Sequence, residues 1–169
     1  MCVEESNLDV KEYKVGIAQW KTTEAPNKLI TLGLGSCVGV ALYDPSSKIG
    51  GLCHIMLPDS TQFKRNENLG KFADTAIPIV YEEMIGMGAR KKGLIAKIAG
   101  GAQMFTSADS KVIGNIGKRN VDKTIEVLKK MGIRLVAKDV GGNHGRTMIF
   151  DTCDGSVFLR ILGKKMKKL

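Results

Sequence analysis

The short segment 44–47, with the sequence Asp-Pro-Ser-Ser, constrains the fold more than any other part of the chain. Its proline fixes the φ angle that the second residue of a β-turn requires, and the Asp44 side chain can hydrogen-bond its own backbone. Apolar, β-compatible runs at 37–43 and 48–57 flank it. Two such runs joined by a tight turn are typical of a hairpin. We therefore predict that they pair as neighbouring antiparallel strands.

Other strands and two helices are predicted around this hairpin. Apolar residues recur at spacings of three and four in 72–87 and 121–128, which is typical of amphipathic helices. One block of strands precedes the helices and another follows them, so the pattern predicts an α+β fold rather than a regular βαβ alternation. The other predicted strands lie at 13–20, 28–32, 94–99, 133–140, 146–152 and 156–162, the last two joined by a turn at 154–155.

The length and apolar content favour one domain. A chain of 169 residues that is 43% apolar can bury one substantial core, so we expect a single domain over 1–169, with frayed tails at 1–12 and 163–169. No secretory signal and no run of about 18 apolar residues is present, which predicts a cytoplasmic protein without membrane insertion. In that setting the four cysteines are expected to be reduced thiols.

The net charge of +9 predicts an acidic partner. Basic residues cluster at 90–92 and again at 164–168 near the C-terminus. No aromatic residues are interleaved with them, although single-stranded nucleic acid is commonly bound by such a mixture. We therefore do not expect nucleic acid to be the partner.

Cys37 and His54 are the residues best suited to catalysis. Each lies about eight residues from the centre of the predicted turn, on opposite sides, so the hairpin is expected to bring them together. A thiol beside an imidazole is the minimal unit of cysteine nucleophilic catalysis, because the imidazole can take the thiol proton. Thr31 is a candidate for orienting the imidazole. Cys53 neighbours His54 on the same strand and is expected to face the other way.

Composition and spacing leave a second interpretation open, in which Cys37 is an inert core cysteine and His54 is structural. The glycines favour catalysis, because Gly33 and Gly35 let backbone amides near Ser36 and Cys37 point at a developing oxyanion. The glycine spacing does not match a dinucleotide-binding fingerprint. Paired cysteine or histidine spacings typical of metal sites are absent, so no metal or other cofactor is predicted.

These residues lie in stretches that resemble the CheD family of chemotaxis proteins. The resemblance extends from about residue 14 to residue 162. Its matching segments are 31–37 (TLGLGSC), 48–58 (KIGGLCHIMLP), 73–76 (ADTA), 100–105 (GGAQMF), 113–114 with 119–120, and 139–146 (DVGGNHGR).

The resemblance implies a receptor glutamine deamidase that releases ammonia through a cysteine thioester, with Cys37, His54 and Thr31 as its catalytic residues. It also implies a β-sandwich-like core of mixed sheets with two to three helices outside, similar to toxin-type cysteine deamidases. The expected partners are methyl-accepting chemotaxis receptors, as substrates, and the phosphatase CheC. Two alternatives are a general cysteine amidase or peptidase, and a regulatory binding module that acts mainly through CheC with little turnover.

Overall fold

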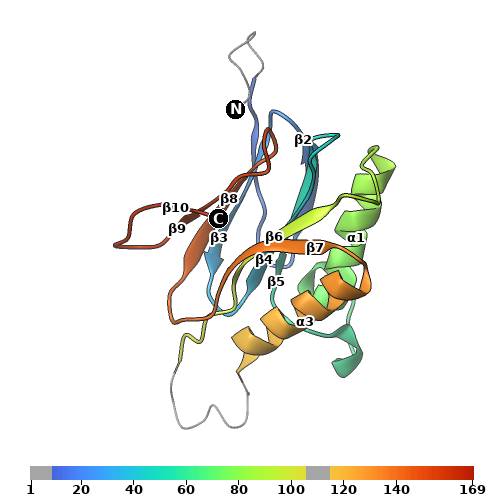
Figure 1. The fold of residues 1–169 in the computed structure, drawn as a ribbon. Helices are drawn as coiled ribbons and strands as arrows, with labels where there is room; N and C mark the ends of the chain where they lie inside the picture. The colour runs from blue at the N-terminus through green and yellow to red at the C-terminus, as the bar shows by residue number, and fades with distance from the viewer. Residues whose placement is uncertain (1–8, 106–114) are drawn as a thin grey trace.

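The computed structural model describes residues 9–105 and 115–169, which form two five-stranded sheets packed face to face (Figure 1). Sheet A contains, in order, β1 (Glu12–Lys14), β3 (Lys28–Leu34), β8 (Arg146–Asp151), β9 (Val157–Arg160) and β10 (Lys167–Lys168). Sheet B contains β2 (Trp20–Glu24), β5 (Ile49–Ile55), β4 (Val38–Asp44), β6 (Ile95–Gly100) and β7 (Arg134–Val140). Neighbouring strands are antiparallel except β1 with β3 and β6 with β7. This sandwich of mixed sheets confirms the predicted fold class.

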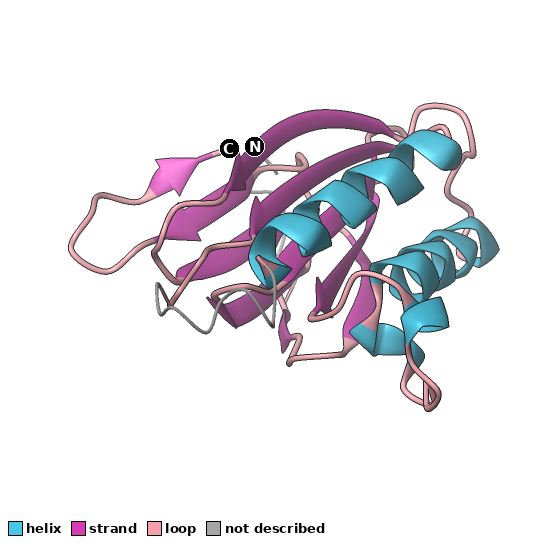
Figure 2. Cartoon of the chain, turned by 90° about the horizontal axis from the view of Figure 1, so that it is seen from below, coloured by secondary structure: helices cyan, strands magenta, loops and turns pink. Residues whose placement is uncertain are grey.

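In the described part of the chain, the α-helices α1 (Ala73–Gly86) and α3 (Ile116–Lys130) lie outside the sandwich against sheet B (Figure 2). Two short 3₁₀ turns, η1 (Ser60–Gln62) and η2 (Leu69–Lys71), precede α1. The Asn115 side chain caps the start of α3 by accepting the Lys118 N–H. The helix ends just before Gly132, whose φ of +72° is in the left-handed region. No helix in the described part of the chain is both long and apolar enough to cross a membrane.

The hairpin of β4 and β5 is buried along its whole length. Sheet A covers one of its faces and the helices cover the other, so successive residues of β5 pack into two different cores. Leu52 belongs to the core between the sheets, whereas Cys53 and Ile55 belong to the core under the helices. The prediction that Cys53 and His54 face opposite ways is confirmed, because His54 contacts a strand of sheet A.

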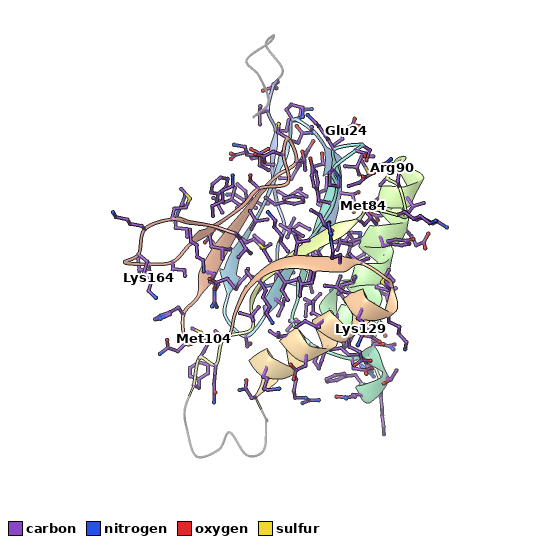
Figure 3. The ribbon with its side chains drawn as sticks, in the orientation of Figure 1. Glu24, Met84, Arg90, Met104, Lys129 and Lys164 are labelled. Carbon is purple, nitrogen blue, oxygen red and sulfur yellow. The ribbon has the colours of Figure 1, made fainter. Side chains whose placement is uncertain are left out.

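The contact between α1 and β5 depends on a residue without a side chain. A Cβ atom at Gly51 would lie 2.3 Å from Val80 Cγ1 and 3.3 Å from the sulfur of Met84. Met84 extends from α1 toward the sheet (Figure 3). We expect Gly51→Ala to lower the unfolding free energy by about 1 to 3 kcal/mol, because the added methyl group overpacks this contact.

Chemical denaturation of the two purified proteins measures that difference. Gly86→Ala is the matched control, since a Cβ at Gly86, the last residue of α1, would contact nothing within 4 Å. It should not lose stability, because alanine is the better helix former. Equal stability of the wild-type protein and the Gly51→Ala variant would contradict the predicted clash.

The predicted turn at 44–47 is confirmed, but the register of its hairpin differs from the prediction by two residues. Asp44 pairs with Ile49 and Gly39 pairs with His54, so the connecting loop contains four residues. Asp44 organises this loop by accepting the Ser46 N–H and the Ser47 hydroxyl, and Lys48 closes it with a left-handed φ of 55°. Cys37 is therefore a diagonal rather than a direct neighbour of His54.

The C-terminal end of the chain differs from the expected frayed tail. At the C-terminal end, Lys167 and Lys168 pair with β9, and Leu169 donates its N–H to Val157 O at 2.8 Å. Lys167 also forms an ion pair with Asp139 at 2.7 Å, so this basic segment has an acidic partner within the chain. At the other end β1 begins at Glu12, and residues 1–8 lie outside the described part.

Candidate active site

His54 and Thr31 meet across the interior of the sandwich, one from each sheet. Both side chains are fully buried, and Thr31 Oγ1 lies 2.7 Å from His54 Nδ1. The single hydroxyl proton of Thr31 is donated to the backbone oxygen of Val15, also at 2.7 Å. The hydroxyl must therefore accept its second hydrogen bond from a proton on Nδ1. This arrangement fixes the neutral imidazole in the tautomer whose Nε2 carries an unshared electron pair.

The Nε2 atom of His54 is available as a proton acceptor. It is buried and has no hydrogen-bond partner among the described residues. Desolvation by burial lowers the pKa of His54 to about 4, so the ring is neutral near pH 7. A neutral, oriented imidazole with a free nitrogen is suited to act as a general base.

Cys37 lies just before β4, on the face of sheet B that carries His54. Gly39 is directly opposite His54, and Cys37 is two residues before Gly39, so the thiol and imidazole are diagonal cross-strand neighbours. Cys37 is partly exposed, which leaves the thiol accessible from outside. No hydrogen bond joins it to His54 in the described structure, and catalytic contacts of this kind often tighten only when substrate binds.

The Cys37 thiol is protonated in the resting site. Burial raises the pKa of the thiol above its ordinary value, an effect that its own backbone N–H partly opposes. The His54 imidazole is also neutral near pH 7. The pair therefore consists of a thiol and an imidazole rather than a preformed thiolate and imidazolium. A nucleophilic attack by a protonated thiol of this kind requires that its proton be transferred to a base during the reaction.

A pH profile of alkylation tests this resting state. We expect the rate at which iodoacetamide modifies Cys37 to rise about tenfold per pH unit from pH 6 to pH 9, because the thiolate is the reactive form. Mass spectrometry of the peptide that contains Cys37 measures the rate. The Cys53→Ala variant is the control and should give the same profile, since burial raises the pKa of the Cys53 thiol to about 12. A rate that is already constant below pH 7 would instead indicate a preformed ion pair.

Every backbone carbonyl from residue 35 to residue 37 is held by a donor from outside the segment. A trans peptide directs its C=O and the next N–H in opposite directions. The N–H groups of Ser36 and Cys37 consequently point away from these donors, and neither donates to a backbone oxygen among the described residues. They are candidate oxyanion donors beside the thiol. The three bonds are Ala102 N to Gly35 O at 2.8 Å, Asn120 Nδ2 to Ser36 O at 2.9 Å and Gly101 N to Cys37 O at 2.8 Å.

The two predicted glycines shape this loop. Gly33 has a left-handed φ of +70° and lies at the irregularity in the pairing of β3 with β8. The Gly35 N–H donates to Gly33 O at 3.0 Å. A Cβ at Gly35 would lie 3.2 Å from Met104 Cγ, so glycine permits the close approach of that side chain.

Asn120 is the site residue to which the sequence assigned no role. It is fully buried on α3, and its Nδ2 donates to Met56 O at 3.0 Å as well as to Ser36 O. It could have been recognised from the sequence as a polar residue on the apolar stripe of an amphipathic helix, directly before Val121.

The remaining candidate ligands and thiols lie apart from this site. His144 is exposed in the loop before β8. Cys37 and Cys53 are free thiols, whereas Cys153 is disulfide-bonded, so the expectation of reduced cysteines is wrong for Cys153. That expectation came from the inferred compartment, whereas disulfide pairing depends on which residues the fold brings together. Among the described residues, no three His, Cys, Asp or Glu side chains are grouped to hold a metal ion.

Comparison with known proteins places these features in a family. The model of the family described as "CheD chemotactic sensory transduction" matches residues 56–161. A protein of Desulforamulus reducens named probable chemoreceptor glutamine deamidase CheD is 55% identical over 156 residues, which cover 92% of this chain and 94% of that protein. A protein of Clostridium botulinum strain Hall with the same name is 54% identical over 162 residues, which cover 96% of this chain and 100% of the relative. The chain therefore belongs to the CheD family.

Proposed function

We propose that this protein is a chemoreceptor glutamine deamidase, which converts glutamine side chains of methyl-accepting chemotaxis receptors to glutamate and releases ammonia. The observation that carries the proposal is the hydrogen bond between Thr31 and His54, because it leaves Nε2 unprotonated on the face that carries Cys37. The activity named for the two relatives supports the choice of substrate. The cytoplasmic location expected from the sequence is part of the proposal.

In the first half of the reaction, His54 Nε2 takes the Cys37 thiol proton as the sulfur bonds to the carboxamide carbon of glutamine. The carbonyl oxygen becomes an oxyanion and accepts the backbone N–H groups of Ser36 and Cys37. The carbon–nitrogen bond then breaks, and the proton held by His54 passes to the nitrogen. Ammonia leaves, and the former glutamine side chain remains attached to Cys37 as a thioester.

In the second half, His54 removes a proton from a water molecule that attacks the thioester carbon. The same backbone amides bind the second oxyanion, and the sulfur leaves as its bond to carbon breaks. The proton on His54 returns to the sulfur, which regenerates the neutral thiol and imidazole pair. The net change is one water consumed, one ammonia released and one glutamate formed.

The surface around the loop suits a protein substrate. Met104 contacts Gly35, is 44% exposed and lies at the lower end of the sandwich (Figure 3). Phe105, the next residue, is 83% exposed, and Leu32, which comes just before Gly33 in β3, is 54% exposed. Exposed apolar side chains beside a reactive group favour docking of another protein's surface. The net charge of +9 would speed encounter with an acidic receptor bundle.

The deciding experiment incubates the protein with a cytoplasmic receptor fragment and follows both released ammonia and peptide masses. We expect one ammonia for each glutamine that gains about one dalton, and an intact fragment backbone. Cleavage of the backbone would favour the general peptidase instead. Unchanged glutamines, together with tight binding of CheC, the proposed regulatory partner, would favour the regulatory binding module.

A further inference from the structure

We propose that Asn120 is a positioning residue that aims the backbone N–H of Cys37 at the reacting oxygen of the substrate. The inference rests on the proposed function in that it assigns a role within the same site. It concerns any reaction at Cys37 in which a carbonyl oxygen becomes an oxyanion, so it can also be tested without glutamine.

The side chain of Asn120 joins three separate segments of the chain. Its Nδ2 group donates both protons, one to Ser36 O at 2.9 Å and one to Met56 O at 3.0 Å. Ser36 precedes the nucleophile, Met56 directly follows β5, and Asn120 itself lies on α3. A single fully buried amide therefore fixes the loop that carries Cys37 relative to the strand that carries His54.

The bond to Ser36 O also sets the direction of one specific amide. The carbonyl of Ser36 and the N–H of Cys37 belong to the same planar peptide and point in opposite directions. While Asn120 holds the carbonyl on the helix side, the Cys37 N–H is directed to the opposite side, within reach of its own thiol. Without the side-chain amide, the peptide between Ser36 and Cys37 would lose the only bond recorded for this carbonyl among the described residues.

The chemistry of asparagine fits this donor role. Its Oδ1 is buried and has no hydrogen-bond partner in the described structure, so the side chain is held through its donated bonds. An aspartate has the same shape but no N–H groups, and its carboxylate would face two carbonyl oxygens. A leucine or valine would fill the apolar face of α3 without an unsatisfied oxygen, so core packing alone does not favour asparagine here.

The test uses Asn120→Asp and Asn120→Ala, each compared with Thr124→Val. Thr124 lies one turn further along α3, is fully buried and also has a side-chain oxygen without a partner, so its replacement perturbs the same helix away from the site. Circular dichroism and thermal unfolding show which variants fold. If the aspartate variant does not fold, the alanine variant is used for the test.

Two reactions of Cys37 are then measured in each folded variant. Acylation by p-nitrophenyl acetate passes through an oxyanion, whereas alkylation by iodoacetamide does not. For the Asn120 variants we expect acylation to slow by about tenfold or more and receptor deamidation to lose about 100-fold in kcat with KM within about threefold, because an oxyanion donor is misplaced. Alkylation should slow much less than acylation, because no oxyanion forms during alkylation. Thr124→Val should change neither reaction.

Two results would overturn the inference. One is wild-type acylation in a folded Asn120 variant. The other is an equal loss of acylation and alkylation, which would mean that Asn120 only supports the thiol. If the wild-type protein releases no ammonia from receptors, the proposed function fails, and the ratio of acylation to alkylation still decides the role of Asn120.

Discussion

A Cys37→Ala variant is expected to leave receptor glutamines unmodified under conditions in which the wild-type protein converts them completely. The methyl group of alanine cannot form the thioester, and loss of a nucleophile in enzymes of this type reduces kcat by about 10⁴-fold or more. Peptide mass spectrometry over a time course measures the conversion. Because Cys37 is partly exposed at the end of a loop, the variant should fold with a stability within about 1 kcal/mol of wild type.

Cys53→Ala is the matched control for that experiment. Cys53 differs from Cys37 in facing the helices, away from Thr31 and His54, and is fully buried. Its replacement should lower stability slightly and leave turnover within about twofold of wild type. A Cys37→Ala variant that converts glutamine at the wild-type rate would eliminate the proposed nucleophile, whatever the effect of Cys53→Ala.

Thr31→Val is expected to cost both turnover and stability. Valine keeps the shape of threonine but cannot accept the proton on His54 Nδ1 or donate to Val15 O, so the imidazole loses its preferred tautomer. We expect kcat to fall by about 100-fold. The two buried polar groups left without partners should lower the unfolding free energy by about 2 kcal/mol or more.

The two effects are separated by assaying well below the unfolding temperature of the variant, as determined by thermal denaturation. Thr31→Ser keeps the hydroxyl and should retain turnover to within about tenfold of wild type. Full activity in Thr31→Val would show that the hydrogen bond to His54 serves packing alone. A loss in Thr31→Ser as large as that in Thr31→Val would point to the missing methyl group rather than the hydroxyl.

The fold was predictable where local chemistry and periodicity agree. The turn after Asp44 follows from its proline and from the carboxylate that accepts nearby backbone and hydroxyl protons. The opposite orientations of Cys53 and His54 follow from the two-residue period of a strand. Because a two-residue difference in register leaves each side chain on the same face, Cys37 and His54 lie on one face of the hairpin although they are not directly paired.

Features that depend on contacts distant in sequence were not predictable. The run at 13–20, predicted as one strand, contains the end of β1 and the start of β2. Between them Ala18 has a left-handed φ of 61°, which cannot be predicted from an alanine in the sequence. Lys167, which pairs with β9, also forms an ion pair with Asp139, an acidic residue far away in the sequence. The proposed role of Asn120 likewise depends on backbone oxygens 84 and 64 positions earlier.

The hydrogen bond between Thr31 and His54 links the two sheets, and Asn120 adds a helix to the same site. A chain emerging from the ribosome can form the β4–β5 hairpin early, because its strands are adjacent in sequence. It cannot yet hold Ser36 O in place, since α3 has not been synthesised. On the proposed mechanism, catalytic competence therefore arises late in folding, and truncated or partly folded chains would carry the thiol and imidazole without being able to deamidate stray glutamines.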